Sequence, residues 1–299
     1  MNKRFKRVAV LMGGASSERA VSLRSGKAVA GGLKEAGYEV EEIDVKGVDF
    51  QIPTGIEAVF VALHGEFGED GRVQEILEKR GLPYTGSGPA ASRQSFDKVL
   101  SKKSFIANGI PTPAYEVLRK GEKRSLDLPV VIKPACQGSS IGVHKVNQES
   151  EWERALIDSF SYGPELIIEA YISGRELTVG VVDKDVLPVV EIVAPDDWYG
   201  FDAKYTKGAS QYLVPAPIEE GLVKACREIT LKTFKVLGCR GMGRVDFRLA
   251  SDGRLYVLEL NNIPGFTETS LLPKAAAQAG IGFSSLCDRI MNTACLDDK

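Results

Sequence analysis

The sequence lacks an excess of either charge, a long apolar run and a compact set of soft metal ligands. Its 38 basic and 40 acidic residues leave a net charge of -2, which gives no support for nucleic acid as a partner. No stretch approaches the roughly 18 apolar residues of a membrane span, so no membrane partner is expected. The basic start is followed only by Val8–Met12 before Gly13, which predicts a first strand and not a signal peptide.

Cysteine and histidine are also scarce. The five cysteines are odd in number and have no CxxC spacing, which predicts reduced thiols and a cytoplasmic location. The only histidines, His64 and His144, lie in different segments, so a structural zinc site is not expected. The 43% apolar and 26% charged composition indicates a globular protein, and 299 residues suggest two domains or three small ones.

The first ninety residues alternate between strand and helix patterns. The predicted elements are a strand Arg7–Met12, a helix from an N-cap at Ser16 or Ser17 to about Ala36, strands Glu39–Val45 and Ala58–Leu63, and a helix Gly71–Arg80. The buried stripe of the first helix is expected to be Val21, Ala28, Val29, Leu33 and Ala36. This order predicts a parallel sheet with ligands at the carboxyl ends of its strands, where Gly13–Gly14 and His64–Gly65 fall. No GxGxxG follows the first strand, which argues against a dinucleotide oxidoreductase.

A connection that begins at Ser87–Pro89 separates the first ninety residues from the remaining predicted elements. The predicted elements are helix Asp97–Asn108, strands Pro129–Lys133 and Gly142–Val146, helix Glu151–Phe160, strands Leu166–Tyr171, Leu177–Val182 and Val186–Ile192, a polar loop Pro195–Gln211, helix Ile218–Leu237, a hairpin, and a final helical segment.

Residues 243–262 predict that hairpin, with Asp252–Gly253 as a two-residue turn. With Ser251 opposite Arg254, the register places Asp246 opposite Glu259 and Arg244 opposite Asn261, all on one face. Facing carboxylates repel unless a cation lies between them, and this set of oxygen donors suits Mg²⁺ shared with phosphates. The alternative is an ordinary surface ion-pair cluster neutralised by Arg244, Arg248 and Arg254.

A loop between two predicted strands resembles a backbone cradle for phosphate oxygens. It reads QGSSIG from Gln137 to Gly142, and Lys133 ends the preceding strand. The alternative is a plain hairpin loop, and the pattern is not a Walker motif. Together with the carboxylate hairpin, however, it makes a nucleotide with its magnesium a joint hypothesis.

Two residues near the strand ends each allow two interpretations. Glu18, in the first turn of its helix, either complements the helix dipole or accepts a substrate ammonium. His64 is either a hydrogen-bonded structural residue or part of a site. The polar loop Phe201–Gly208 is either a lid or a plain surface excursion.

Several motifs in order along nearly the whole chain resemble the D-alanine–D-alanine ligase family of the ATP-grasp superfamily. They are GGASSERAVSLRSG, LHGEFGEDG, PYTGSG, DK at Asp97–Lys98, VIKP with QGSSIGV, AKYT, GRVDFRL and LELNNIPGFTETSL. The resemblance implies an α/β ATP-grasp fold of three domains. These are a parallel, Rossmann-like substrate domain over residues 1–93, a central α+β domain with the phosphate loop over 94–175, and a C-terminal α+β domain with the lid and Mg²⁺ site over 176–299.

The activity implied by the resemblance is ATP-dependent joining of two D-alanines through an acyl phosphate, with release of ADP and phosphate, for peptidoglycan. It also implies a cytoplasmic homodimer with small-molecule substrates, ATP, and two Mg²⁺ ions that Mn²⁺ can replace. Two alternatives are a ligase that joins D-alanine to another D-amino acid or hydroxy acid, and a nucleotide-binding regulator that has lost catalysis.

The same resemblance assigns residues to roles. The resemblance places Lys98 and Lys133 at the nucleotide phosphates, with Ser139, Ser140 and Gly142 in the loop above them. It places Glu169, Ala170, Tyr171 and Ile172 around the adenine and Glu176 at the ribose, and it adds Lys204 and Leu258 as further nucleotide-binding residues. The metal ligands are Asp246, Glu259 and Asn261. Glu18 would hold the first D-alanine ammonium, linked through Ser139 to Tyr205, with His64 beside the substrate, and Arg244, Gly265 and Ser270 would hold the second D-alanine and the oxyanion.

Two positions bear on specificity and loop shape. Family ligases that accept D-lactate replace the lid tyrosine, so Tyr205 favours an amino acid as second substrate. Asn262–Ile263 stand where the family often has threonine with a small or apolar residue, which affects only the local loop.

Overall fold

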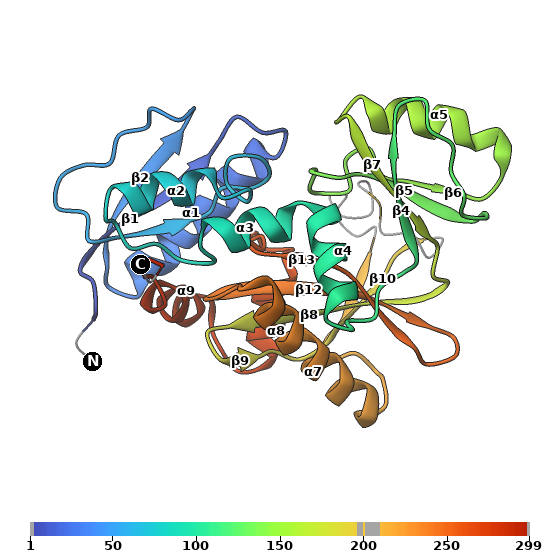
Figure 1. The fold of residues 1–299 in the computed structure, drawn as a ribbon. Helices are drawn as coiled ribbons and strands as arrows, with labels where there is room; N and C mark the ends of the chain where they lie inside the picture. Colours follow the sequence, from blue (N-terminus) through green and yellow to red (C-terminus); the bar gives the residue numbers. More distant parts are fainter. Residues whose placement is uncertain (1–2, 196–199, 201–209, 298–299) are drawn as a thin grey trace.

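The N-terminal sheet is parallel, as the alternation of strands and helices predicts. In the computed structural model, which describes residues 3–195, 200 and 210–297, β1 lies between β2 and β3 (Figure 1). The bounds are β1 Arg7–Gly13, α1 Arg19–Glu35, β2 Glu39–Val45, β3 Ala58–Val61 and α2 Arg72–Lys79. The inner residues of β1 are buried because both faces of the sheet are covered. Loops at the carboxyl ends of β1 and β3 therefore meet at one edge.

The N-cap of α1 differs from the prediction. Neither Ser16 nor Ser17 caps the helix, which begins after Glu18. The Ser16 hydroxyl instead donates to the His64 carbonyl at 2.7 Å and accepts the Glu18 amide at 3.3 Å. The serine thus ties together the two loops at the strand ends, and this tertiary role replaces the local cap.

The connection after the first sheet is helical, which the sequence did not predict. It forms α3, Pro89–Phe96, with Pro89 in its first turn. The next helix, α4, spans Lys98–Ala107, and its Asp97 cap accepts the amides of Val99 and Leu100. The prediction of a helix from Asp97 is therefore confirmed.

The middle sheet is antiparallel and has the strand order β4-β7-β5-β6. Its elements are β4 Tyr115–Arg119, β5 Val130–Pro134, β6 His144–Val146, α5 Glu149–Phe160 and β7 Glu165–Ala170. Strand β4 was not predicted. The helix α5 packs on β5, β6 and β7 over a small apolar core that includes Ile132 and Leu166.

The third sheet is antiparallel and has the path β11-β10-β8-β12-β13, with β9 beside β8. Its elements are β8 Gly174–Val182, β9 Asp185–Val186, β10 Val190–Val193, β11 Gln211–Leu213, α7 Glu220–Leu237, β12 Met242–Ala250 and β13 Leu255–Asn261. The prediction of one strand over Val186–Ile192 is wrong because Pro188, which has no amide donor, separates two strands. Strand β11 was also missed.

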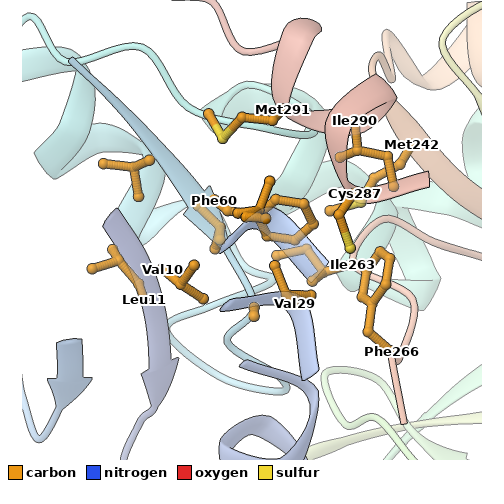
Figure 2. Packing of buried hydrophobic residues seen from close by; sticks show 14 of the residues in the cluster. Val10, Leu11, Val29, Phe60, Met242, Ile263, Phe266, Cys287, Ile290 and Met291 are labelled. Carbon is orange, nitrogen blue, oxygen red and sulfur yellow. The ribbon is translucent and has the colours of Figure 1, made fainter. Parts of the chain in front are cut away.

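Two C-terminal helices complete the core of the N-terminal sheet. These are α8, Leu271–Gln278, and α9, Phe283–Asn292. Figure 2 shows Ile290 and Met291 of α9 beside Phe60 of β3, in one cluster that also holds Val10 and Val29. The first and third sheets therefore share one continuous apolar core, which fixes the loops of one relative to those of the other. Among the described residues no helix is long and apolar enough to cross a membrane.

Candidate active site

The hairpin β12–β13 aligns the residues predicted to bind a metal. Arg244 pairs with Asn261 and Asp246 with Glu259, as the sequence predicts. The turn that should produce this register is nevertheless different. Ala250 bonds to Arg254 across a three-residue loop, which shifts the pairing by one position, and a bulge between Asp246 and Phe247 shifts it back.

Cations already lie at both carboxylates of this pair. The Arg244 guanidinium donates to both oxygens of Asp246, at 2.8 and 2.9 Å, and Thr178 donates to the same carboxylate at 2.5 Å. Lys98 Nζ lies 3.4 Å from Glu259. Of the three arginines in the alternative interpretation, Arg244 bonds to Asp246, whereas Arg248 pairs with Glu176 and Arg254 pairs with Asp252. The pair thus lies in a positive environment and is not a simple surface cluster.

The QGSSIG loop joins antiparallel strands β5 and β6 and adopts an unusual backbone. Ser139 and Ser140 have φ values of 53° and 58°, in the left-handed region that non-glycine residues seldom adopt. Lys98 donates to the Gln137 carbonyl at 2.6 Å, and Ser159 of α5 donates to the Gly142 carbonyl at 2.8 Å. Bonds at both ends therefore hold a strained loop, a combination typical of functional loops.

Glu169 is buried between two lysines. Its carboxylate lies 2.6 Å from the amino groups of both Lys102 and Lys133. Burial alone would raise the Glu169 pKa, but the two ammonium groups outweigh burial and lower it. Burial lowers the pKa of Lys102 to about 8, against the attraction of Glu169, whereas for Lys133 the attraction of Glu169 and Glu259 exceeds the effect of burial and raises the pKa. The cluster fixes Lys133 beside the phosphate loop.

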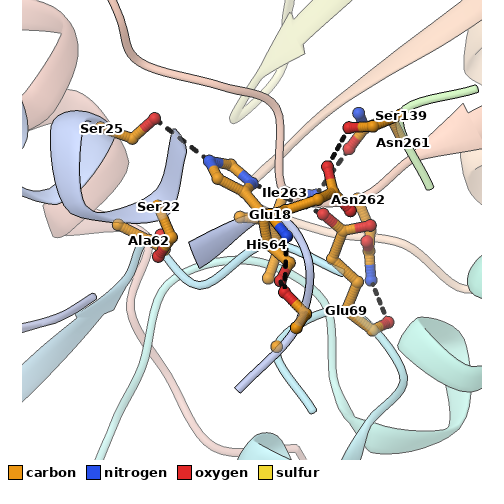
Figure 3. Close-up of polar contacts among 12 residues, drawn as sticks. Glu18, Ser22, Ser25, Ala62, His64, Glu69, Ser139, Asn261, Asn262 and Ile263 are labelled. Atoms are coloured by element: carbon orange, nitrogen blue, oxygen red, sulfur yellow. Dashed lines mark hydrogen bonds and ion pairs between the residues drawn. The ribbon is translucent and has the colours of Figure 1, made fainter. Parts of the chain in front are cut away.

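A cavity of about 650 Å³ lies where the N-terminal sheet, the QGSSIG loop and the β12–β13 hairpin meet. Seven predicted substrate and metal residues line it, namely Glu18, His64, Arg244, Glu259, Asn261, Gly265 and Ser270. Ser139 donates a hydrogen bond to Glu18, which links the loop to the N-terminal helix (Figure 3). Val21 and Ala28, expected in the buried stripe of α1, instead line this cavity, while Val29 and Leu33 are buried as predicted.

His64 fits both of its interpretations. Its ring is buried, with Nε2 3.1 Å from the Ser25 hydroxyl and Nδ1 3.5 Å from Glu69, and it also lines the cavity (Figure 3). The Asn262 amide donates to the Glu69 carbonyl at 3.0 Å. A structural network therefore positions the histidine at the cavity wall.

A second hollow, of about 80 Å³, lies between the middle and third sheets. Predicted nucleotide residues line it, namely Lys133, Ser140, Glu169, Ala170, Tyr171, Ile172, Glu176 and Leu258. The hollow shares Lys98, Gln137, Gly138, Ser139 and Glu259 with the larger cavity. A molecule in one hollow would therefore meet a molecule in the other at the phosphate loop and Glu259.

Two family models match the chain, one described as D-ala D-ala ligase C-terminus over residues 105–292 and one described as D-ala D-ala ligase N-terminus over residues 46–87. The chain belongs to the D-alanine–D-alanine ligase family. Two relatives are the D-alanine–D-alanine ligases of Methylacidiphilum infernorum, 47% identical over 97% of this chain and 96% of the relative, and of Syntrophotalea carbinolica, 46% identical over 97% of each.

Solved structures of the family have the same fold. A D-alanine–D-alanine ligase from Bacillus anthracis superposes with a TM-score of 0.85 at 36% identity, covering 96% of this chain and 97% of that one. A structure of a D-alanine–D-alanine ligase from Bacillus anthracis complexed with ATP gives a TM-score of 0.85 at 35% identity, covering 98% of this chain and 97% of that one. The predicted α/β ATP-grasp fold, with a parallel N-terminal sheet, and the class of activity, ATP-dependent ligation, are confirmed.

Within this family framework, some predicted residues were not placed and others were missed. Lys204 and Tyr205 of the expected lid lie outside the described residues. Lys102 and Arg248 were not assigned roles, although the first contacts Glu169 and the second lines the nucleotide hollow. Lys102 stands in the polar run SKKS, where nothing in the sequence distinguishes a buried lysine from an exposed one.

Proposed function

We propose that this chain joins two D-alanines with ATP, forming D-alanyl-D-alanine, ADP and phosphate for peptidoglycan synthesis. The observation that carries the proposal is the common wall of the two hollows. A nucleotide between the middle and third sheets would have its terminal phosphate near Lys98, Ser139 and Glu259, which also line the larger cavity. The carboxylate of an amino acid in that cavity would therefore lie beside the phosphate that it must attack.

The residues of the hairpin fit Mg²⁺. The donors are two facing carboxylates, Asp246 and Glu259, and the amide oxygen of Asn261, all of which are hard oxygen ligands. The guanidinium on Asp246 and the ammonium near Glu259 are placed where positive charge is needed. Within the described part of the chain no group of three or more His, Cys, Asp or Glu side chains could hold a metal ion, and the set proposed here is two carboxylates with one amide. When bound, two Mg²⁺ ions, or Mn²⁺ in their place, would neutralise phosphate charge.

The side chains account for each chemical step. Glu18 would bind the ammonium of the first D-alanine. The carboxylate of that D-alanine would then attack the γ-phosphate of ATP to give an acyl phosphate and ADP. Lys98 and Lys133 would neutralise the transferred phosphoryl group. The neutral amine of the second D-alanine would then attack the acyl carbon, and phosphate would leave.

The second step requires stabilisation of an oxyanion and exclusion of water. Arg244 and Gly265 both line the larger cavity, and a guanidinium with a backbone amide is suited to bind the developing negative charge. The Gly265 position is close to Ser270, since a Cβ there would lie 2.7 Å from the serine hydroxyl. The QGSSIG loop and the 201–208 segment would exclude water from the acyl phosphate, because water would hydrolyse it.

The direct test is a product assay with the full chain. ATP, Mg²⁺ and D-alanine are expected to give ADP, phosphate and D-alanyl-D-alanine in equal amounts by mass spectrometry, with little ADP when D-alanine is omitted. Competition between D-alanine and D-lactate tests the acceptor, and we expect the dipeptide to predominate because Tyr205 is present. Failure to form any dipeptide or depsipeptide would overturn the ligase assignment.

We also propose a cytoplasmic homodimer and the three domains 1–93, 94–175 and 176–299. The support for the location is that the five cysteines are free thiols. Light scattering coupled to size-exclusion chromatography would test the dimer, and limited proteolysis would test the boundaries. A mass of one chain would contradict the dimer.

A further inference from the structure

Arg248 is an arginine buried within the third sheet. It lies on β12 opposite Glu176 of β8 and Tyr256 of β13. Only 6% of its surface is exposed, and it lines the hollow assigned to the nucleotide. A guanidinium cannot lose its proton in a protein, so its burial requires partners that use its donors.

Those partners lie in one short segment, the crossing from β7 to β8. Arg248 Nε donates to the Ile172 carbonyl at 3.0 Å, and its terminal nitrogen donates to the Gly174 carbonyl at 2.7 Å. The other terminal nitrogen lies 3.2 Å from Glu176 Oε2. The guanidinium carbon is also 5.6 Å from the ring centroid of Tyr171. One side chain therefore binds four of six consecutive residues.

The backbone of this crossing is shaped to receive the arginine. Gly174 has a φ of 141°, and a Cβ there would lie 2.1 Å from the Leu249 carbonyl. Only glycine permits this close approach between the crossing and β12. The approach brings the Gly174 carbonyl within reach of the neighbouring Arg248.

The same crossing forms a wall of the nucleotide hollow through Tyr171, Ile172 and Glu176. We propose that Arg248 is a positioning residue for the nucleotide: it holds the backbone of Tyr171–Ile172 for the adenine and orients Glu176 toward the ribose. This inference rests on the proposed ATP-dependent function. Arg248 would affect nucleotide binding indirectly, because it fixes the backbone of the crossing and the side chain of Glu176.

The geometry requires an arginine. Its planar fork donates in several directions at once, whereas a lysine ammonium is a compact charge on a flexible stem. Lysine at this position would keep a positive charge near Glu176 but could not bond both carbonyls in the same way. Methionine would remove every donor and leave the two carbonyls and the carboxylate without this partner.

The test compares Arg248→Met and Arg248→Lys with wild type in steady-state ligation. For Arg248→Met we expect the KM for ATP to rise about 10-fold or more, the size of losing one or two charged hydrogen bonds. The kcat at saturating ATP and the KM for D-alanine should change little. The KM of Arg248→Lys for ATP should lie between the values for wild type and Arg248→Met. Arg254→Met, on the same hairpin but exposed and paired with Asp252, is the matched control and should behave like wild type.

A second readout separates positioning from simple stability. Wild type is expected to favour ATP over 2′-deoxy-ATP and 3′-deoxy-ATP through Glu176, and this preference should shrink in both Arg248 variants. Loss of thermal stability alone would not change the preference. If Arg248→Met does not fold, Arg248→Lys supplies both measurements.

The inference would be overturned if a folded variant kept the wild-type KM for ATP and the wild-type preference for ribose hydroxyls. It would also be overturned if the KM for D-alanine rose as much as that for ATP. A wild-type enzyme without D-alanine-dependent ADP release would instead refute the proposed function, so the two failures are distinguishable.

Discussion

Asp246 and Glu259 are direct partners across the β12–β13 hairpin, with Arg244 on the first carboxylate and Lys98 near the second. The strand pairing brings the two carboxylates opposite each other, and each of them has its own cation nearby. The arrangement is suited to exchange these contacts for a divalent ion and phosphates. Substitutions in this hairpin should therefore lower the activity without unfolding the protein.

Glu259→Gln should strongly reduce turnover while leaving the fold intact. Glutamine keeps the size of the side chain but removes one of the two charges that attract the cation, and it relieves the repulsion with Asp246. We expect kcat/KM to fall by about 100-fold or more, because metal neutralisation contributes several kcal/mol to such reactions. Phosphate release measured against Mg²⁺ concentration checks this.

Glu228→Gln is the matched control for this substitution, since Glu228 is an exposed residue of α7 that lies 3.9 Å from Lys224. It should keep the wild-type dependence on Mg²⁺. Unchanged turnover of Glu259→Gln at limiting Mg²⁺ would refute the metal role.

The register of this hairpin also illustrates what the sequence can and cannot predict. The facing of Asp246 and Glu259 was predicted correctly from a two-residue turn that does not exist. The loop has three residues, and the extra shift is cancelled by a bulge beyond Asp246. The alternation of polar and apolar residues determined which face of the sheet each side chain occupies. A slip by one residue would expose the apolar side chains of the strand, and this costs more free energy than an irregular turn.

Arg244→Ala should lower the rate of the chemical step. We expect a loss of about 3 kcal/mol of transition-state stabilisation, comparable to removing an oxyanion donor. The affinity for ATP should change less than kcat. Arg244→Lys keeps the charge and should recover part of the rate. Should only the ATP affinity respond, Arg244 would have no role at the oxyanion.

Several residues that depend on long-range contacts were misassigned or left unassigned by the sequence. Ser16 looked like a helix cap but bonds to His64, which is 48 positions away. Lys102 and Arg248 looked like ordinary charges in polar patterns, yet each is buried and bound to groups from other elements. Local patterns predict the parallel sheet and most of the helices, whereas such contacts depend on how the three sheets meet.

Lys102 should make stability rise with pH in the alkaline range. Its pKa is lowered by burial to about 8 in the folded protein, below the value of 10.5 for the free side chain. Between these values the unfolded chain binds a proton that the folded chain has released, so the free energy of unfolding increases with pH. The difference in unfolding free energy between wild type and Lys102→Met should therefore grow by about 3 kcal/mol over this range.

Urea denaturation at intervals from pH 7.5 to 10.5 measures this difference. Lys103→Met removes the neighbouring exposed lysine of α4 and serves as the control. A wild-type minus Lys102→Met difference that stays flat or decreases with pH would contradict the expected titration.

Gly138→Ala should weaken binding of D-alanine through Glu18. A Cβ at position 138 would lie 2.6 Å from the Glu18 carboxylate, so the carboxylate must move from its place beside Ser139. If Glu18 binds the ammonium of the first D-alanine, losing this charged hydrogen bond raises the KM for that substrate by about 10-fold or more. Gly163→Ala is the control, because a Cβ there meets no atom within 4 Å. Initial rates at varied D-alanine and ATP decide the matter, since a rise only in the KM for ATP would place Glu18 outside the ammonium site.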